Sequence, residues 1–395
     1  MAGIWDDIQY ILKYVYLEPI REQLNNTTDY LAQIKKTSQD VSGEGLRVPL
    51  HMGRNSGIAT LGTTGTASLP TAGKQGHRRF TVLTKDSYAG ILLYGKEFRA
   101  TKNDKGAFKN ILKVEVEGAM DDAKVDVERQ LVMSDTTGQL TTCTASTTSD
   151  VVTVASTQYL EAGMKVDIGA DTNLEIESVD SATQITMTAS LTYVSGEVIK
   201  RTGVTSGDEL NGLALMLSNT ATLMGLDVAS YPFWKANVRG TAGSPVALQE
   251  MQLITVCDDI HNKGGVCDYI ITGYGGRRAA FNILKDRIRQ EPLKLKGGFE
   301  ALAWSAGAKE IPITCNRFWP ETTTETSFGF LSLKDMAMAK MSDFDWMDHD
   351  GNVLARQTGS SKKEAYEGTL VADHEHITYA RCHLGLLAGV TPVSA

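Results

Sequence analysis

The sequence predicts an α+β fold that combines a long helix, an extended β-hairpin and a small inserted all-β domain. The helix is indicated by apolar residues that recur at spacings of three and four between residues 104 and 137. The hairpin is indicated by two apolar segments on either side of a long glycine-rich tip. The all-β domain is indicated by a later stretch dominated by Thr, Ser, Val and Ile.

Composition limits the classes of protein that the chain can represent. Its 395 residues are 42% hydrophobic and 22% charged, which suffices to bury a core in two or three structural units. The formal net charge of −8 disfavours a protein that reads or coats DNA. Acidic residues near Met1 replace the basic start of a secretory signal, and no apolar run reaches bilayer length, so we expect no membrane partner. The cysteines are scattered, so we expect no disulfide framework.

Residues 1–45 are predicted to form an N-terminal arm. Trp5, Ile8 and Leu12 belong to a helical apolar stripe, and Pro19 ends the run. A short amphipathic helix at a chain terminus is marginal alone and needs a surface on which to dock. Its own subunit and a neighbouring subunit are both open as that surface.

Residues 46–103 are predicted to form the hairpin, with arms at 46–52 and 80–98. The tip is rich in glycine and has almost no periodic apolar residue; its glycines are Gly53, Gly57, Gly62, Gly65, Gly73 and Gly76. So long a structureless span inside a closed domain is uncommon unless the loop acts outside its own subunit. The hairpin therefore favours an assembly protein.

Residues 104–137 are predicted to hold the long amphipathic helix, with Asp104 as N-cap and Gly138 just beyond the end. The apolar face carries Phe108, Leu112, Val116, Ala119, Ala123, Val127 and Leu131, and the adjacent charged face carries Lys109, Lys113, Glu117, Asp121, Lys124 and Glu128. At 1.5 Å per residue the helix would be roughly 40 Å long, longer than a small domain is wide. We expect it to act as a spine, the alternative being a core helix of an α/β enzyme.

Residues 138–203 are predicted to be the inserted all-β domain, because β-branched alternation replaces the helical period. Its strands are expected at 151–155, 164–168, 174–179, 185–188 and 198–201. No cluster of aromatic or basic side chains indicates a ligand site in it.

Residues 204–326 and 327–395 carry mixed helical and strand patterns. One helix should follow Pro245, with an inner face made of Leu248, Met251, Ile254, Cys257 and His261. A second is expected at 278–289, with Phe281, Leu284 and Ile288 inward. Strands are expected at 267–272, 328–333 and 377–387.

Two short motifs could carry chemistry. His374 and His376 would point the same way on a strand and could share a metal with an acidic partner, although the spacing is not that of HExxH. The glycines at 273–276, followed by Arg277, could meet a phosphate, but GxGxxG spacing is missing and a turn that begins a helix is preferred. We therefore predict no catalytic, metal-binding or cofactor-binding residue in the leading hypothesis, and no cofactor.

The order of these parts, together with several short motifs, resembles the major capsid protein of tailed double-stranded-DNA bacteriophages over nearly the whole chain. The motifs lie at 53–57, 69–70, 88–94, 129–131, 225–227, 231–235 and 384–390. The resemblance implies that 1–45 is the N-terminal arm, 46–103 the E-loop, 104–137 the spine helix of the P-domain, 204–326 mainly the A-domain, and 327–395 P-domain strands with a return to the A-domain. The insertion at 138–203 is found in only some members.

The resemblance further implies self-assembly, through hexamers and pentamers, into an icosahedral head shell that encloses double-stranded DNA without sequence-specific contact. Its other expected partners are the portal, scaffold and decoration proteins of the same phage. The protein would be assembled in the host bacterial cytoplasm, would reside in the virion and would not be an enzyme. Contacts between subunits are expected at Trp5, Ile8, Leu12, Arg54, Leu61, Leu69, Arg78, Arg79 and Tyr88.

Two alternatives stay open. One is an α/β metal-dependent hydrolase that uses His374 and His376. The other is a surface or adhesin-like assembly protein, which the Thr- and Ser-rich domain at 138–203 favours and the missing export signal disfavours.

Overall fold

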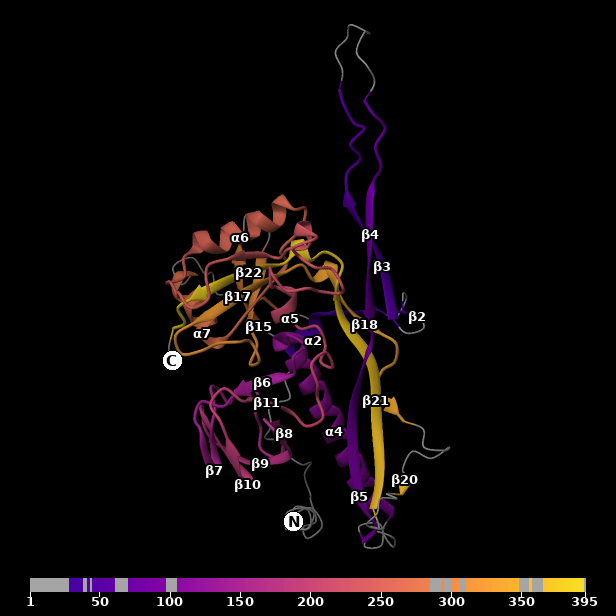
Figure 1. Cartoon of the computed structure of the whole chain (residues 1–395), viewed down its shortest axis with the longest axis vertical. Helices are drawn as coiled ribbons and strands as arrows, with labels where there is room; N and C mark the ends of the chain where they lie inside the picture. The colour runs from indigo at the N-terminus through magenta and orange to yellow at the C-terminus, as the bar shows by residue number, and fades with distance from the viewer. Residues whose placement is uncertain are drawn as a thin grey trace.

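The computed structural model describes residues 28–37, 41–42, 45–60, 70–96, 105–284, 293–294, 300–305, 310–347, 355–356 and 365–393. The molecule is elongated, with a lobed body beside a long ribbon of strands that projects well beyond it (Figure 1). Helices and sheets are mixed throughout, which confirms the predicted α+β class.

The long helix is confirmed as α4 (Lys105–Met133). In its described part, only the last turns are deeply buried, through Val125, Val127, Leu131 and Val132. Glu128, expected on the charged face, is fully buried, so that expectation was wrong. Gly138 has a φ of 76° but lies five residues past the helix, where it serves the turn into the next strand instead of the helix end. Asp104 lies outside the described residues.

The hairpin consists of β3 (Gly45–Gly53) and β4 (Gly76–Leu83), which pair antiparallel and are flanked at the base by β2 (Val41–Ser42). The expected second arm at 80–98 was wrong, because the chain changes partner at Thr84. Leu83 pairs with Gly45 at the start of β3, so the hairpin offers no further partner. The chain continues as β5 (Lys85–Tyr94), which pairs with β21 (Ala365–Thr378) over its whole length.

The sheet beneath the hairpin contains six strands. β21 pairs with β5 over residues 365–374 and also pairs, over shorter lengths, with three further strands: β18 (Met336–Lys340), β19 (Asp345–Trp346) and β20 (Ala355–Arg356). β1 (Lys35–Thr37) adds to β18 in parallel. The strand expected at 377–387 was wrong as a single element, because β21 ends at Thr378 and a short 3-10 helix, η3 (Arg381–His383), intervenes.

The all-β character of 138–203 is confirmed. Its six strands are β6 (Gln139–Thr142), β7 (Thr147–Thr153), β8 (Lys165–Ile168), β9 (Asp171–Ser181), β10 (Gln184–Tyr193) and β11 (Val198–Arg201). β6, which was not predicted, begins the order β6-β11-β8-β9-β10-β7. A bridge between Cys143 and Val154 joins the two ends, so the strands form a closed ring around an apolar interior. Entry and exit strands are adjacent, since Lys200 pairs with Gln139.

The upper lobe is built on a seven-stranded mixed sheet. Its order is β12 (Asn237–Arg239), β22 (Gly385–Val390), β17 (Thr326–Leu331), β13 (Tyr269–Thr272), β16 (Glu310–Cys315), β15 (Glu300–Ser305) and β14 (Leu293–Lys294). The helices α6 (Glu250–Asn262) and α7 (Tyr274–Leu284) pack on it. The strands expected at 267–272 and 328–333 are confirmed as β13 and β17, with shifted ends.

Both predicted helix faces of this lobe needed correction. In α6, Leu253, Val256, Cys257 and Ile260 face the sheet, whereas Met251 is 66% exposed and His261 is also exposed. α7 begins at Tyr274, and its small residues Ala279 and Ala280 are buried while Phe281 is 52% exposed. Small side chains let a helix lie close to a sheet, so the buried face of a helix need not carry its largest apolar residues. Ile288 lies outside the described residues.

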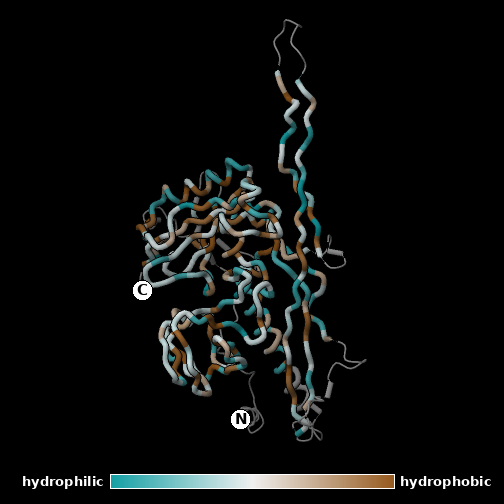
Figure 2. The backbone as a smooth tube through the Cα atoms, viewed as in Figure 1, coloured by the Kyte–Doolittle hydropathy of each residue, from teal (hydrophilic) through white to brown (hydrophobic). Residues whose placement is uncertain are grey.

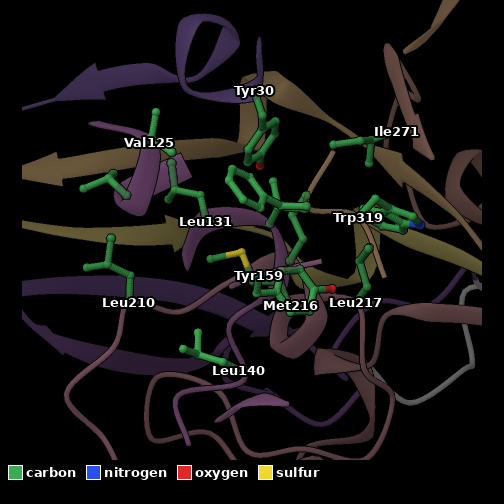
Figure 3. Close-up of a cluster of buried hydrophobic side chains, with 14 of the residues drawn as sticks. Tyr30, Val125, Leu131, Leu140, Tyr159, Leu210, Met216, Leu217, Ile271 and Trp319 are labelled. Carbon is green, nitrogen blue, oxygen red and sulfur yellow. The ribbon is translucent and has the colours of Figure 1, made fainter. Parts of the chain in front are cut away.

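One continuous core joins the parts. Side chains from α4, from the inserted domain and from the segment 210–217 meet around Leu131, as Figure 3 shows for Tyr159, Leu210, Met216 and Leu217. α5 (Leu213–Met216) contributes Leu213 and Met216 to this core. A second cluster fills the space between α6, α7 and the upper sheet. Hydrophobic segments run through the body, while hydrophilic and intermediate residues dominate along the projecting hairpin (Figure 2).

Candidate functional site

The base of the hairpin is anchored in the core. Leu46, Phe80 and Val82 are almost fully buried, and the Phe80 ring lies 6.0 Å from the Trp234 ring, centroid to centroid. Trp234 ends the short helix η1 (Pro232–Trp234). The Arg78 guanidinium lies over the ring of Tyr231, 5.8 Å from its centroid. The direction in which the hairpin leaves the body is therefore fixed by packing.

Beyond this base most of the hairpin side chains are exposed, while Val48, Leu50 and Met52 are half-buried. The register places Pro49 opposite Arg79 and His51 opposite His77, all with side chains in solvent. The two imidazole rings lie 5.2 Å apart. A two-stranded ribbon has little stability of its own in water, and its open edges are templates for pairing with another chain. This geometry suits contact with a partner.

The residues predicted to contact neighbouring subunits fall into three groups. Arg54, Arg78 and Arg79 are exposed on the hairpin. Tyr88 is 61% exposed but lies on β5, opposite Val371 of β21, and so belongs to the sheet beneath the hairpin. Trp5, Ile8, Leu12, Leu61 and Leu69 lie outside the described residues.

The described end of the N-terminal arm packs on its own chain. α2 (Asp29–Gln33) contacts α4, and the Tyr30 side chain is fully buried. The Glu128 carboxylate accepts hydrogen bonds from the backbone N–H groups of Tyr30 and Leu31 and from the Asn316 side chain. Burial raises the pKa of Glu128 to about 7 although these donors favour the charged form.

A second set of buried charges lies where β5, α4 and the chain near residue 209 meet. Arg129 donates to Glu209 at 2.5 Å and to Asp126 at 2.9 Å. Arg201 of the inserted domain approaches the same Asp126 at 3.1 Å. Lys85, at the start of β5, lies 3.5 Å from the buried carboxylate of Glu375. Together these pairs connect the root of the hairpin to the spine helix, the inserted domain and β21.

These buried charges were not predicted from the sequence. The one sign of them in the sequence is that two charged residues, Glu128 and Arg129, stand between the apolar residues Val127 and Leu131 of the predicted helix. That pattern alone cannot distinguish a solvated face from one covered by another segment of the chain. Glu209 and Glu375 carry no comparable signal.

His374 and His376 are held in the core. His376 Nδ1 lies 2.9 Å from the carbonyl oxygen of Asn211, and its Nε2 lies 3.3 Å from the hydroxyl of Tyr30. His374 Nε2 lies 3.2 Å from the hydroxyl of Ser87. Burial lowers the pKa of each histidine to about 4. The described residues contain no group of three or more His, Cys, Asp or Glu arranged to hold a metal ion. Nothing here supports the hydrolase alternative.

The glycine motif at 273–276 does begin a helix, as expected, but α7 already starts at Tyr274, so Gly275 and Gly276 lie in its first turn. The N–H groups of Gly275 and Gly276 donate to the Glu321 carboxylate of the same chain, at 2.8 and 3.2 Å. This anion position is therefore filled from within.

None of the helices in the described part of the chain has the length and hydropathy needed to cross a bilayer. No family model and no curated protein sequence matches the chain. Among solved structures, a chain of the cyanophage A-1(L) capsid asymmetric unit matches with a TM-score of 0.57 and 10% identity, over 98% of this chain and 99% of that chain.

The chain has the fold of a phage capsid protein. Weaker matches are a chain from the capsid of a native GTA particle (TM-score 0.49, 12% identity, 99% of each chain) and the SrpI encapsulin of Synechococcus elongatus (TM-score 0.49, 10% identity, 99% of this chain and 97% of that chain). The assignment of the capsid fold rests on the cyanophage chain. It confirms the fold predicted from the order of hairpin, long helix and mixed domain.

Proposed function

We propose that this chain is the major capsid protein of a tailed bacteriophage, whose copies assemble into an icosahedral head shell around double-stranded DNA. The observation that carries the proposal is the projecting hairpin, anchored by Leu46 and Phe80 and exposed beyond them, on a chain with the capsid fold. An element of this kind gains a packed environment when a second copy covers it.

The parts then have distinct roles. Of the predicted E-loop at 46–103, the hairpin up to Leu83 reaches an adjacent subunit while β5 stays in the sheet with β21, and 1–45 act as the N-terminal arm. Residues 104–137 and the strands of 327–395 form the P-domain, and 204–326 form most of the A-domain around the five- and six-fold centres. The described hairpin residues Arg54, Arg78 and Arg79, together with Tyr88, contact neighbouring copies in this arrangement.

Stability of the shell comes from many modest contacts. Each contact buries apolar area that contributes roughly 25 cal/mol per Å². Because every subunit joins several neighbours at once, the effective concentration at each further contact is high. Hexamers and pentamers of one sequence require the same contacts at slightly different angles, which a glycine-rich hairpin tip permits.

The proposal has partners beyond the chain itself. The net charge of −8 suits a wall that encloses DNA without holding it, so no sequence-specific DNA contact is expected. Portal and scaffold proteins of the same phage would direct assembly in the bacterial cytoplasm, and decoration proteins would bind the finished virion. Glu128, Glu375 and His376, whose pKa values burial shifts, are buried in the fold, in keeping with a structural, non-enzymatic protein.

Negative-stain microscopy of the purified protein tests the proposal. Round shells of uniform size are expected. A monodisperse monomer that carries stoichiometric zinc would favour the hydrolase instead, and sheets or fibres would favour an adhesin-like assembly protein.

A further inference from the structure

A groove of about 810 Å³ lies between three parts of the chain. One wall is residues 84–90 at the start of β5, which runs beside α4 (Figure 1). The other walls come from α4 between residues 119 and 130 and from the segment 201–210. Its volume lies within the range of small-molecule sites in proteins. The groove is therefore large enough to take an organic molecule.

The charge of the groove is negative. The charged residues that line it are five acids and two bases: Asp86, Asp122, Asp126, Asp208, Glu209, Lys85 and Arg201. Both bases already have acidic partners, since Lys85 lies 3.5 Å from Glu375 and Arg201 lies 3.1 Å from Asp126. The groove therefore keeps an excess of negative charge after these ion pairs are formed, and it attracts cations.

One carboxylate of the groove is only half satisfied. Glu209 is 3% exposed, and its Oε1 accepts a hydrogen bond from Arg129 at 2.5 Å. Its Oε2 is buried and accepts no hydrogen bond from the part of the chain that the structure describes. A buried charged acceptor without a donor costs free energy, and native proteins rarely leave one. Because Glu209 lines the groove, a cationic donor bound there supplies the missing hydrogen bond.

A second acidic position lies on β5. Asp86 is exposed in the groove and lies directly opposite Asp373 of β21 in the strand register. Like charges in that position destabilise a sheet. Burial and the neighbouring Asp86 raise the pKa of Asp373. A cation placed beside this pair would relieve the repulsion.

The positions of the acids favour an elongated cation over a metal ion. Asp86, Asp122 and Glu209 come from three different walls, and the described residues hold no group of three or more His, Cys, Asp or Glu that could bind a metal ion. A linear aliphatic polyamine carries ammonium groups separated by short methylene chains, so its charges can meet carboxylates that lie apart. Apolar residues that can cover the methylenes line the same groove: Ala89, Ala119, Ala123, Val127, Val204 and Leu210.

We propose that the groove between β5, α4 and the segment 201–210 is a binding site for a linear aliphatic polyamine such as spermidine. One ammonium group donates to Glu209 Oε2, another lies beside Asp86, and the methylenes lie along the apolar residues. This inference goes beyond the proposed function and does not depend on it, because one chain supplies the whole site. The ligand links three parts that are far apart in the sequence, so it stabilises the folded state by mass action.

Equilibrium dialysis of the purified full-length chain against labelled spermidine tests this assignment. Saturable binding of one molecule per chain is expected. Asp86→Asn and Glu209→Gln should each weaken binding by about tenfold, which corresponds to the loss of one charge-assisted hydrogen bond. The matched control is Glu177→Gln, which removes the same charge from an exposed position on the inserted domain and should bind as the parent does.

The two groove variants serve different purposes. Glu209→Gln tests the half-satisfied carboxylate but also weakens the contact with Arg129. Asp86→Asn keeps an acceptor for the hydroxyl of Tyr88 and removes the repulsion from Asp373, so it should fold and stay informative if Glu209→Gln does not. Spermidine should raise the melting temperature of the parent by more than that of Asp86→Asn.

Two competitors separate a built site from general attraction between opposite charges. Putrescine has one ammonium group fewer than spermidine and should bind more weakly. Magnesium chloride should displace no more spermidine than sodium chloride of the same ionic strength does. Equal affinity of the parent and both groove variants, many weakly bound molecules per chain, or preferential displacement by magnesium would overturn the site. None of these measurements requires particles to form, so failure of the proposed function would leave their outcome unchanged.

Discussion

The carboxylate of Glu128 accepts a hydrogen bond from the backbone N–H of Tyr30 at 2.9 Å, although 98 residues separate the two in the chain. It also accepts from Leu31 at 2.7 Å. Both donors belong to the first turn of α2, where N–H groups have no partner inside a helix. Glu128 therefore caps one helix from the middle of another and fastens residues 28–37 to the spine.

Replacement of Glu128 should destabilise the fold. Glu128→Ala leaves the buried donors of Tyr30, Leu31 and Asn316 without an acceptor, so a loss of about 3 kcal/mol in the free energy of unfolding is expected. Glu128→Gln keeps one acceptor oxygen and should lose less. Urea unfolding followed by circular dichroism gives both values. The matched control is Glu117→Ala on the exposed face of the same helix, expected within about 0.5 kcal/mol of the parent. Equal losses for the two alanine variants would contradict the capping role.

A buried glutamate and a buried histidine make the free energy of unfolding depend on pH in opposite directions. Burial raises the pKa of Glu375 to about 7 from 4.5. Between these two pH values the folded state keeps a proton on Glu375 that the unfolded chain has released. The contribution of Glu375 to the free energy of unfolding is therefore complete below pH 4.5 and is lost as pH rises through about 7. Burial lowers the pKa of His376 to about 4 from 6.5. Its contribution is complete above pH 6.5 and is lost as pH falls through about 4.

The pH dependences from Glu375 and His376 overlap. The effect of Glu375 is therefore best measured as the difference in unfolding free energy between the parent and a variant at this position. Glu375→Gln cannot ionise, so it should gain stability relative to the parent by on the order of 3 kcal/mol as pH rises from 5 to 8. Unfolding free energies at a series of pH values measure this gain. Glu117→Gln, at an exposed site, should run parallel to the parent. Parallel curves for Glu375→Gln as well would mean that the carboxyl is already ionised at pH 5.

Removal of metal should leave the protein unchanged. Both ring nitrogens of His376 already face polar partners in the chain, which leaves no lone pair directed at an ion. EDTA treatment is therefore expected to shift the melting temperature by less than about 1 °C, which for a chain of 395 residues corresponds to about 1 kcal/mol or less. Elemental analysis should find no stoichiometric zinc before treatment. One zinc per chain, lost together with thermal stability in EDTA, would revive the hydrolase.

The pair of Arg129 and Glu209 should behave as a coupled unit. Arg129→Leu leaves Glu209 and Asp126 buried beside an apolar side chain, which is expected to cost about 3–5 kcal/mol. Adding Glu209→Leu removes one unpaired charge, so the double variant should be more stable than the single one. A double-mutant cycle by chemical denaturation measures this coupling. If the losses simply add, the two side chains do not interact in solution.

Sequence patterns correctly predicted the helices and strands whose buried face is set by residues close to one another in the chain. The apolar spacing from Val116 to Leu131 predicted α4, and β-branched alternation predicted the strands of 138–203. The change of pairing partner at Thr84 could not be predicted from the sequence. Without knowing where β3 begins, β4 and β5 cannot be told apart from one continuous strand. The buried charges were also beyond reach. Whether Glu128 contacts water or α2 depends on a segment about 100 residues away in the chain. The hydrophobic periodicity of the helix itself carries no information about that segment.

Shortening the hairpin separates folding from assembly. Deletion of residues 55–75 leaves Leu46, Phe80 and Val82 in place, and these side chains anchor the base. We therefore expect a subunit with the circular dichroism spectrum and melting temperature of the parent that forms no closed particles in negative-stain images. The contrasting variant is Phe80→Ala, which keeps the tip but removes a buried ring and should lower stability by about 3–5 kcal/mol. Normal particles from the deletion would remove the tip from the assembly mechanism. A deletion that melts as early as Phe80→Ala would show instead that the tip supports its own subunit.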